Sequence, residues 1–245
     1  MELAEIFGLV VGGLLAGVVN TLAGGGSLVT VPLLILLGLP GGVANGTNRV
    51  GILVQSLMAI GSFRAHGISE FRSATPILIP VLMGSALGAA AITRTSDETF
   101  ERLFAVLMLA LLIPTLRRTS ATAPVARTWS PLTRMAVFFA IGIYGGAFQA
   151  GVGIILLIAL SHAGIDLVRA NAMKMLVVGA LTAVAIPVFV IGDQIAWLPA
   201  AVLAGGYAIG GAAGARLAVH GGEALIRPVL GIAVVVMAGS LLGLF

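Results

Sequence analysis

The chain has 245 residues, of which 59% are hydrophobic and only 9% are charged, and its mean hydropathy is +1.15. Water-soluble globular domains are far less apolar, so the sequence predicts an integral membrane protein in contact with a lipid bilayer. The absence of cysteine excludes disulfides, thiolate catalysis and cysteine metal sites. The net charge of +4 does not indicate a nucleic-acid partner, because the basic residues are scattered between apolar segments rather than clustered on one helix.

The N-terminal segment is predicted to stay in the mature protein, because Glu2 and Glu5 precede its first apolar stretch whereas a secretory signal begins with basic residues. Two short apolar stretches follow, at Ile6–Val19 and Leu28–Leu39. Both fall short of the roughly 20 residues that span the hydrocarbon core. The break between them, from Asn20 to Ser27, is rich in glycine. Irregular backbone at membrane depth is tolerated only inside protein or beside a cavity, so the break points to a site.

Three longer stretches complete the first half of the chain, and each has the length of a membrane span. They run from Asn45 to Phe63, from Ala74 to Ile92 and from Phe100 to Leu116. The stretch that follows contains prolines and several arginines and is too charged to cross lipid. The sequence therefore predicts a first transmembrane repeat at residues 1–117, a cytoplasmic linker at residues 118–134 and a second repeat at residues 135–245.

The second half repeats this order of elements. Two short stretches, Met135–Phe148 and Val152–Leu160, flank a break at Gln149–Gly153, and three span-length stretches follow at Met173–Ile191, Leu198–Leu217 and Pro228–Leu244. Glycines and polar residues match between the halves, with Gly13, Gly17 and Asn20 opposite Gly142, Gly146 and Gln149, and Gly84 and Gly88 opposite Gly206 and Gly210. The plainest interpretation is a duplicated unit of about 120 residues.

The arginines between the segments indicate how the chain is threaded. If each short pair is a hairpin that returns to its starting side, one face holds only Arg94 and Arg102. The other face then collects Arg64, Arg72, Arg117, Arg118, Arg127, Arg134, Arg169, Arg216 and Arg227. If each pair is instead one broken span, the arginines divide almost evenly between the two faces, so we favour hairpins. Two full short spans would also return the chain to its starting side, and the sequence does not separate these two cases. The halves are then inverted, with the termini outside and the central loop in the cytoplasm. The predicted fold is an all-α membrane protein of two inverted repeats, each a re-entrant-like hairpin of short helices plus three transmembrane helices, with about 8 spans or 10 helical segments.

Acidic residues and histidines lie at or near the ends of the predicted segments, and no pair of them shares a helical face within a span. A buried proton relay, a metal site or a membrane enzyme is therefore not expected, nor is any cofactor. The residues concerned are Glu2, Glu5, Glu70, Asp97, Glu98, Glu101, Asp166, Asp193, Glu223, His66, His162 and His220.

Two basic residues differ from those in the loops. Arg49 lies on an apolar segment, and Lys174, the only lysine in the chain, lies at nearly the equivalent place in the second half. A cation buried without a partner costs about 3 kcal/mol on insertion scales, and a bound anion would supply the missing charge. The alternative is that each side chain extends to the lipid headgroups. The polar side chains beside them are Asn45, Asn48, Gln55 and Asn171.

The glycine-rich breaks offer a second means of holding an anion. Each precedes an apolar helical run, so backbone N–H groups at the start of that helix can face an oxyanion. Alternatively, the glycines only permit close helix packing. The residues of the breaks that we predict to bind substrate are Asn20, Gly24, Gly25, Gly26, Ser27, Gln149, Gly151 and Gly153.

The run from Gly17 to Ser27, together with Val31-Pro32-Leu33 and Ala44-Asn45-Gly46-Thr47-Asn48, resembles the TauE/SafE sulfite exporter family, also called the toluene sulfonate uptake permease family. The resemblance covers nearly the whole chain and implies a carrier in the cytoplasmic membrane of a bacterium or archaeon. It also implies two repeated halves, usually assigned about eight spans, and a sulfite, sulfoacetate or related sulfur-containing anion as substrate. The second half has Gln149 in place of Asn20 and lacks the full glycine tract.

Together these features predict a secondary transporter that exports small oxyanions by alternating access, with the two hairpin tips meeting near the midplane. An anion channel, an ion-coupled uptake permease for sulfur-containing organic anions and a non-transporting scaffold remain alternatives. The exact substrate, the direction of transport and the coupling ion are left open. So is a homo-oligomer, because small-residue faces pack helices equally well within one chain and between copies.

Overall fold

The computed structural model describes residues 1–116, 129–162 and 164–241, and within these ranges it consists of helices and contains no strand. The predicted all-α class is confirmed for these residues. Most of the predicted linker, residues 117–128, lies outside them. The helices are α1 (Leu3–Leu22), α2 (Ser27–Leu36), α3 (Gly41–Ala65), α4 (Phe71–Ile92), α5 (Asp97–Leu116), α6 (Pro131–Ala147), α7 (Val152–His162), α8 (Leu167–Ile191) and α9 (Trp197–Leu241).

Among the described residues, four segments are long and apolar enough to cross a membrane, namely α1, α4, α8 and the Trp197–Gly221 part of α9. The expectation that the first segment is short, at Ile6–Val19, is wrong, because α1 has 20 residues. A capping box lengthens its start: the backbone N–H of Glu2 donates to the Glu5 carboxylate over 2.8 Å. By contrast α2, with 10 residues, is as short as predicted.

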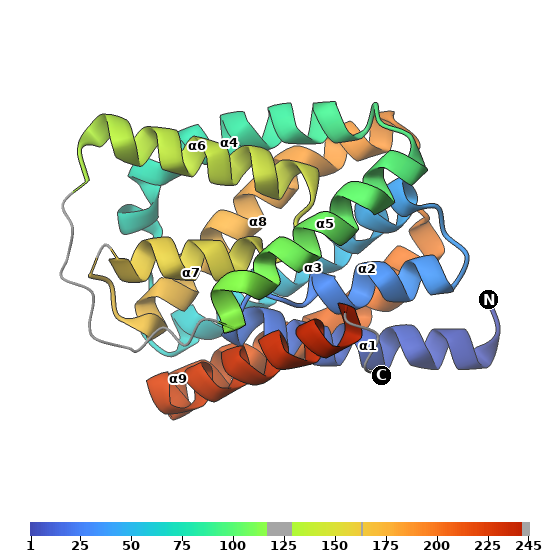
Figure 1. Ribbon diagram of the computed structural model, residues 1–245. Coiled ribbons are helices and arrows are strands. Elements are labelled where there is room, and N and C mark those ends of the chain that lie inside the picture. The colour runs from blue at the N-terminus through green and yellow to red at the C-terminus, as the bar shows by residue number, and fades with distance from the viewer. Residues whose placement is uncertain (117–128, 163, 242–245) are drawn as a thin grey trace.

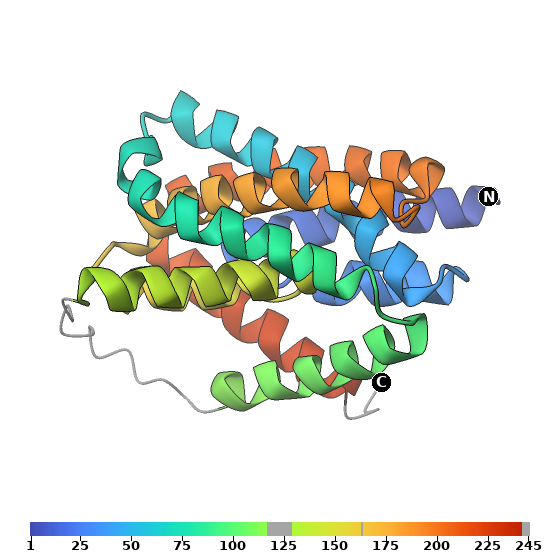
Figure 2. The ribbon, with the colours of Figure 1, turned by 90° about the horizontal axis from the view of Figure 1, so that it is seen from above.

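The other boundary errors have similar local causes. Helix α6 begins at Pro131 rather than Met135, because the Ser130 hydroxyl accepts the N–H of Thr133 and a proline suits the first helical turn. The two spans expected at Leu198–Leu217 and Pro228–Leu244 fall within one helix, α9, as far as residue 241, where the described part of the chain ends. Glycines between them raise the free energy of the helix by about 1 kcal/mol each but do not forbid it. Figure 2 shows that the orange first part of α9 and its red last part run in different directions.

The two short helix pairs open toward opposite ends of the molecule. In Figure 1, α1 starts at the right and α2 returns there, whereas α6 starts at the left and α7 returns there. Between them, α3 and α8 pack against each other near the centre, and each has 25 residues. The tips of the two helix pairs therefore reach the middle of the bundle from opposite ends.

Each half supplies its first helix to the other half. Helix α1 packs along α9, and a Cβ added to Gly13 would lie 2.5 Å from the carbonyl oxygen of Leu203. A Cβ added to Gly17 would lie 3.0 Å from the Cα of Gly210. Close backbone contact of this kind is how small residues hold helices together in lipid. The glycines at these positions are needed for packing.

The corresponding contact in the other direction joins α6 to α4. A Cβ at Gly142 would lie 2.3 Å from the Val81 carbonyl oxygen, and a Cβ at Gly146 would lie 2.1 Å from that of Ser85. The glycine pairs matched in the sequence thus occupy matching interfaces. Gly8 differs, because nothing lies within 4 Å of a Cβ built there.

Candidate functional site

The tips of the two helix pairs touch. Gly24 adopts a φ of +94°, and a Cβ added to it would lie 2.3 Å from the carbonyl carbon of Gly153 and 2.5 Å from its Cα. Gly151 at the second tip also has a positive φ, of 69°. Only glycine combines a left-handed backbone with so close an approach at low cost. The two glycine-rich breaks, far apart in the sequence, therefore come together.

Lys174 lies beside the first tip. Its side chain is 0% exposed, and its ammonium group donates to the carbonyl oxygens of Asn20 over 2.9 Å and Thr21 over 2.7 Å. The third donor reaches Oδ1 of Asn171 over 2.7 Å, and the Asn171 amide donates to the Leu22 carbonyl over 3.3 Å. These carbonyls lie at the end of α1, where no further helical turn supplies N–H groups to donate to them. A lysine of the second half thus caps the first helix of the first half.

Arg49 makes the reciprocal contact at the second tip. It is also 0% exposed, and its guanidinium donates to the last carbonyls of α6 at residues 145, 146 and 147 over 3.2, 2.6 and 3.0 Å. It also donates to Oε1 of Gln149 over 2.9 Å and lies over the Phe189 ring, 4.4 Å from its centroid. Asn45 donates to the Ala147 carbonyl over 2.8 Å. The end of α6 is thereby held by α3.

Burial of both cations contradicts the alternative in which they extend to lipid headgroups. No ion pair joins either of them to an acidic residue in the described part of the chain. Their partners are helix C-terminal carbonyls, which together carry roughly half a negative charge. The carbonyls therefore compensate the charge of each cation only in part.

Amide side chains brace both tips. Asn20 donates to Gln55 over 2.9 Å, and Gln55 donates in turn to the Thr21 hydroxyl over 2.9 Å. The Asn20 side chain also accepts the N–H of Gly26, over 3.4 Å, so one of the donors predicted for an anion is already engaged. At the other tip Gln149, with a φ of 62°, donates to Thr182 over 2.8 Å.

Three neighbouring side chains on α3 keep buried polar atoms without a hydrogen-bond partner among the described residues. They are Oδ1 of Asn45, Nδ2 of Asn48 and Nε of Arg49, one acceptor and two donors within about one helical turn. Buried polar atoms are nearly always paired in folded proteins, and an unpaired one costs about 1–3 kcal/mol. A bound anion or water beside this stretch of α3 would therefore form hydrogen bonds that these buried atoms lack.

The structure brings every predicted residue of the site into the interior, although at two tips rather than around one point. The residues described above are accompanied by Gly25 and Ser27, both buried in the first break.

Tyr207 was not predicted from the sequence. It is buried, and its hydroxyl lies 2.9 Å from the Thr30 hydroxyl and donates to Oδ1 of Asn48 over 3.1 Å. Tyr207 packs on Gly51, and Thr30 also donates to Asn48 over 2.7 Å. The only sign of Tyr207 in the sequence was a tyrosine among small residues, because its hydrogen-bond partners lie in the other half of the chain.

This arrangement, with several apolar spans and cations buried between them, defines a multi-pass membrane protein. The sequence profile described as "Sulfite exporter TauE/SafE" matches residues 9–241, and the chain belongs to this family. A Haemophilus influenzae protein named "Probable membrane transporter protein" is 30% identical over 224 residues, or 89% of this chain and 87% of the relative. "Probable membrane transporter protein YfcA" of Escherichia coli strain K12 is 25% identical over 235 residues, or 94% and 86%. No solved structure matches.

Proposed function

We propose that the chain is a secondary transporter for small oxyanions, which exports sulfite or an organosulfonate such as sulfoacetate across the cytoplasmic membrane by alternating access. Family membership and the names of the relatives support transport as the class of function. The substrate, the direction and the mechanism are our inference from the buried cations and the tips.

The observation that carries the proposal is the burial of Arg49 and Lys174 with neutral partners only. The cost of a charge in a low-dielectric interior falls when an opposite charge binds beside it. Helix carbonyls satisfy most of the N–H groups but leave about half of the positive charge uncompensated. An oxyanion that enters between the tips would complete the neutralisation and accept from the unpaired donors of Asn48 and Arg49.

Alternating access would follow from the exchange of helix ends between the halves. We propose that α1–α5 and α6–α9 are inverted repeats, because Arg49 of one half holds the end of α6 while Lys174 of the other holds the end of α1. When an anion draws one cation away from its carbonyls, that helix end is released while the other stays capped. The substrate path would then open on one side at a time.

Export is the direction that the membrane potential favours. The free energy of a monovalent anion falls by about 2.3 kcal/mol per 100 mV when it leaves a negative cytoplasm. The described interior has no buried carboxylate beside the tips to carry a coupling proton. Export driven by the membrane potential therefore requires no coupling group beside the tips.

The proposal is tested with purified protein in liposomes loaded with labelled sulfite, sulfoacetate, taurine or sulfate. We expect efflux of sulfite or sulfoacetate that is faster when the interior is made negative. Liposomes preloaded instead with unlabelled substrate should transiently accumulate external label, which a channel does not show. Efflux equal to that of protein-free liposomes for all four anions would contradict the proposal, and conductance without exchange would identify a channel instead.

A further inference from the structure

The loop after each central helix lies against the start of the other central helix. The loop after α3 ends at Glu70, which pairs with Arg169 in the first turn of α8. The loop after α8 contains Gln194, and a Cβ added to Gly46, near the start of α3, would lie 1.9 Å from the Gln194 carbonyl oxygen. Each helix has 25 residues and is therefore about 37 Å long, so the two contacts lie at opposite ends of the bundle.

At the first end the contact is an ion pair. The Glu70 side chain is only 9% exposed, and its Oε1 lies 3.0 Å from Nε of Arg169, whose side chain is 65% exposed. Asp166 lies farther from that nitrogen, at 4.0 Å, and caps α8 by accepting the backbone N–H of Arg169 over 3.0 Å. A buried carboxylate that loses its cation is strongly destabilised. Glu70 is therefore stable in its buried position only while Arg169 pairs with it.

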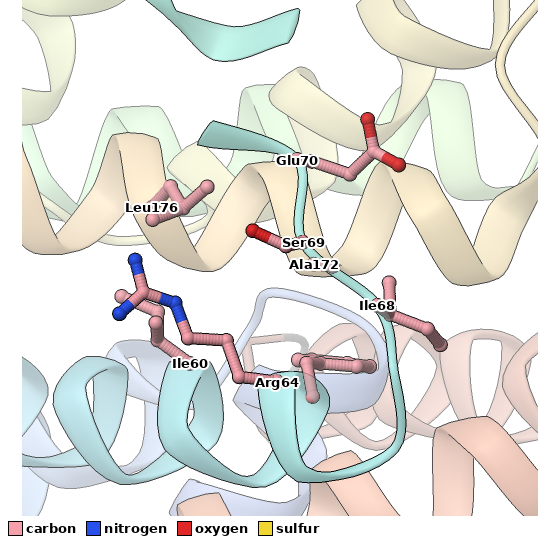
Figure 3. A pocket seen from close by; sticks show the side chains of 8 residues that line it. Ile60, Arg64, Ile68, Ser69, Glu70, Ala172 and Leu176 are labelled. Carbon is pink, nitrogen blue, oxygen red and sulfur yellow. The ribbon is translucent and has the colours of Figure 1, made fainter. Parts of the chain in front are cut away.

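A small hollow lies between this ion pair and the first tip. Ser69 and Glu70 line it from the loop, and it has room for about one water molecule. Figure 3 shows the loop that carries Ser69 and Glu70 passing across α8 at Ala172. Phe63 and Ala172 also line the hollow, and both belong to the same apolar cluster as Leu22 at the end of α1. Separation of Glu70 from Arg169 would therefore open the hollow toward the first tip.

At the other end the contact contains no charge. The Thr47 hydroxyl accepts the backbone N–H of Ala196 over 2.9 Å, beside the close backbone packing on Gly46. Within the described ranges, no ion pair joins this loop to α3. Arg49 and Lys174 are both 0% exposed, so the structure is closed at both ends. One end is closed by an ion pair, and the other by backbone packing and a neutral hydrogen bond.

Each contact is built on the same helix as a buried cation. On α8, Arg169 lies five residues before Lys174, or about 7–8 Å along the helix axis. On α3, Thr47 lies two residues before Arg49. A helix transmits a displacement as a rigid element over so short a distance. A shift of α8 that frees Lys174 from the end of α1 would therefore also pull Arg169 away from Glu70.

We propose that these two contacts are the gates of the transporter, and that the Glu70–Arg169 ion pair holds the gate closed on the side where α3 ends. The arginines of the loops predict that this side is the cytoplasmic one. The inference rests on the proposed transport function and adds the residues that open and close the path. An anion that draws Lys174 away from the first tip moves the start of α8 and separates the ion pair, while the neutral contact at the other end stays closed.

The ion pair is tested by the reactivity of a thiol placed behind it. Ala172 lines the hollow and is 4% exposed, and the chain has no cysteine, so Ala172→Cys supplies a single reporter. In this background Glu70→Gln should raise the rate of labelling by a membrane-impermeant thiol reagent about tenfold, which corresponds to about 1.4 kcal/mol in favour of the open form. Arg169→Gln should raise it at least as much, because it leaves the carboxylate unpaired. The double variant should label no faster than Arg169→Gln alone, because both substitutions remove one contact. Asp166→Asn keeps the N-cap and is the matched control, which should label like the reporter alone.

The link to transport is tested by bridging the two positions. In Glu70→Cys/Arg169→Cys, a short bifunctional thiol reagent should stop the exchange of labelled sulfoacetate in liposomes. Each single cysteine variant, treated in the same way, should continue to exchange. Bridged protein that exchanges at the rate of unbridged protein would overturn the gate.

The remaining results separate this inference from the proposed function. A parent that exchanges no anion overturns the proposed function and the gates with it. A parent that exchanges, while Glu70→Gln, Arg169→Gln and Asp166→Asn all leave the labelling rate unchanged, overturns only the gate ion pair. A lower unfolding midpoint of Glu70→Gln without faster labelling assigns the ion pair to stability alone and also overturns it.

Discussion

Gly24→Ala adds one methyl group at the contact between the two tips. Gly38→Ala is a matched control for its effect on the free energy of unfolding. Gly24 and Gly38 have nearly the same positive φ, +94° and +87°. A Cβ at Gly24 would lie 2.3 Å from the carbonyl carbon of Gly153, whereas nothing lies within 4 Å of a Cβ at Gly38. Both variants pay for a left-handed alanine, about 1–2 kcal/mol. Only Gly24→Ala also forces backbone atoms apart.

The difference between the two variants therefore measures the contact itself. Overpacking of a closely packed interior costs about 1–3 kcal/mol, and here the clash is with backbone, which cannot rotate away. We expect Gly24→Ala to be destabilised by about 1–3 kcal/mol more than Gly38→Ala in denaturant unfolding in detergent, and to lose sulfonate exchange. Equal destabilisation of the two variants, with exchange retained in both, would refute the close approach of the tips.

Three further substitutions follow from buried contacts. Tyr207→Phe removes the hydroxyl shared with Thr30 and Asn48 and should lower stability by about 1–1.5 kcal/mol in denaturant unfolding; no change would contradict the buried hydrogen bonds. Ser56→Cys introduces the only thiol of the chain, and because Ser56 is buried, an anionic thiol reagent should react slowly until a transported anion is added. Reaction at the same rapid rate with and without the anion would contradict the burial of Ser56 against α8. Gly46→Ala places a Cβ 1.9 Å from a carbonyl oxygen of the loop after α8, so it should displace that loop and raise proteolysis there, and parent-like proteolysis would contradict the contact.

The order of helices was predictable because hydropathy and glycine reflect local physics. The break from Asn20 to Ser27 and the break from Gln149 to Gly153 were found as interruptions of apolar runs, and they are the two tips that touch. The matched glycines predicted a duplicated unit, and the structure places them at close helix contacts, which require small residues at four-residue spacing. The length of α1 was misjudged because polar residues near its end stay helical when buried partners accept them.

The partners of the buried cations were not predictable from sequence. Arg49 and Lys174 each cap a helix from the other half, and no local pattern reveals which helix end lies beside them in space. The sequence did show that no acidic residue lies near either cation. It could not show which backbone carbonyls accept their N–H groups, because every residue has a carbonyl. Tyr207 escaped notice because its partners Thr30 and Asn48 are distant in the sequence.

The charge of the buried cations is tested most directly by substrate exchange in variants that keep the shape of the side chain. Lys174→Met retains the apolar stem without the ammonium, and Arg49→Lys retains the charge without the guanidinium fork. With folding checked by the unfolding midpoint, Lys174→Met should require at least about tenfold more sulfonate for half-maximal exchange, because a charged hydrogen bond contributes about 1.5–3 kcal/mol. Arg49→Lys should keep exchange at reduced affinity. Exchange in Lys174→Met with the half-saturating concentration of the parent would contradict a role for this charge in anion binding.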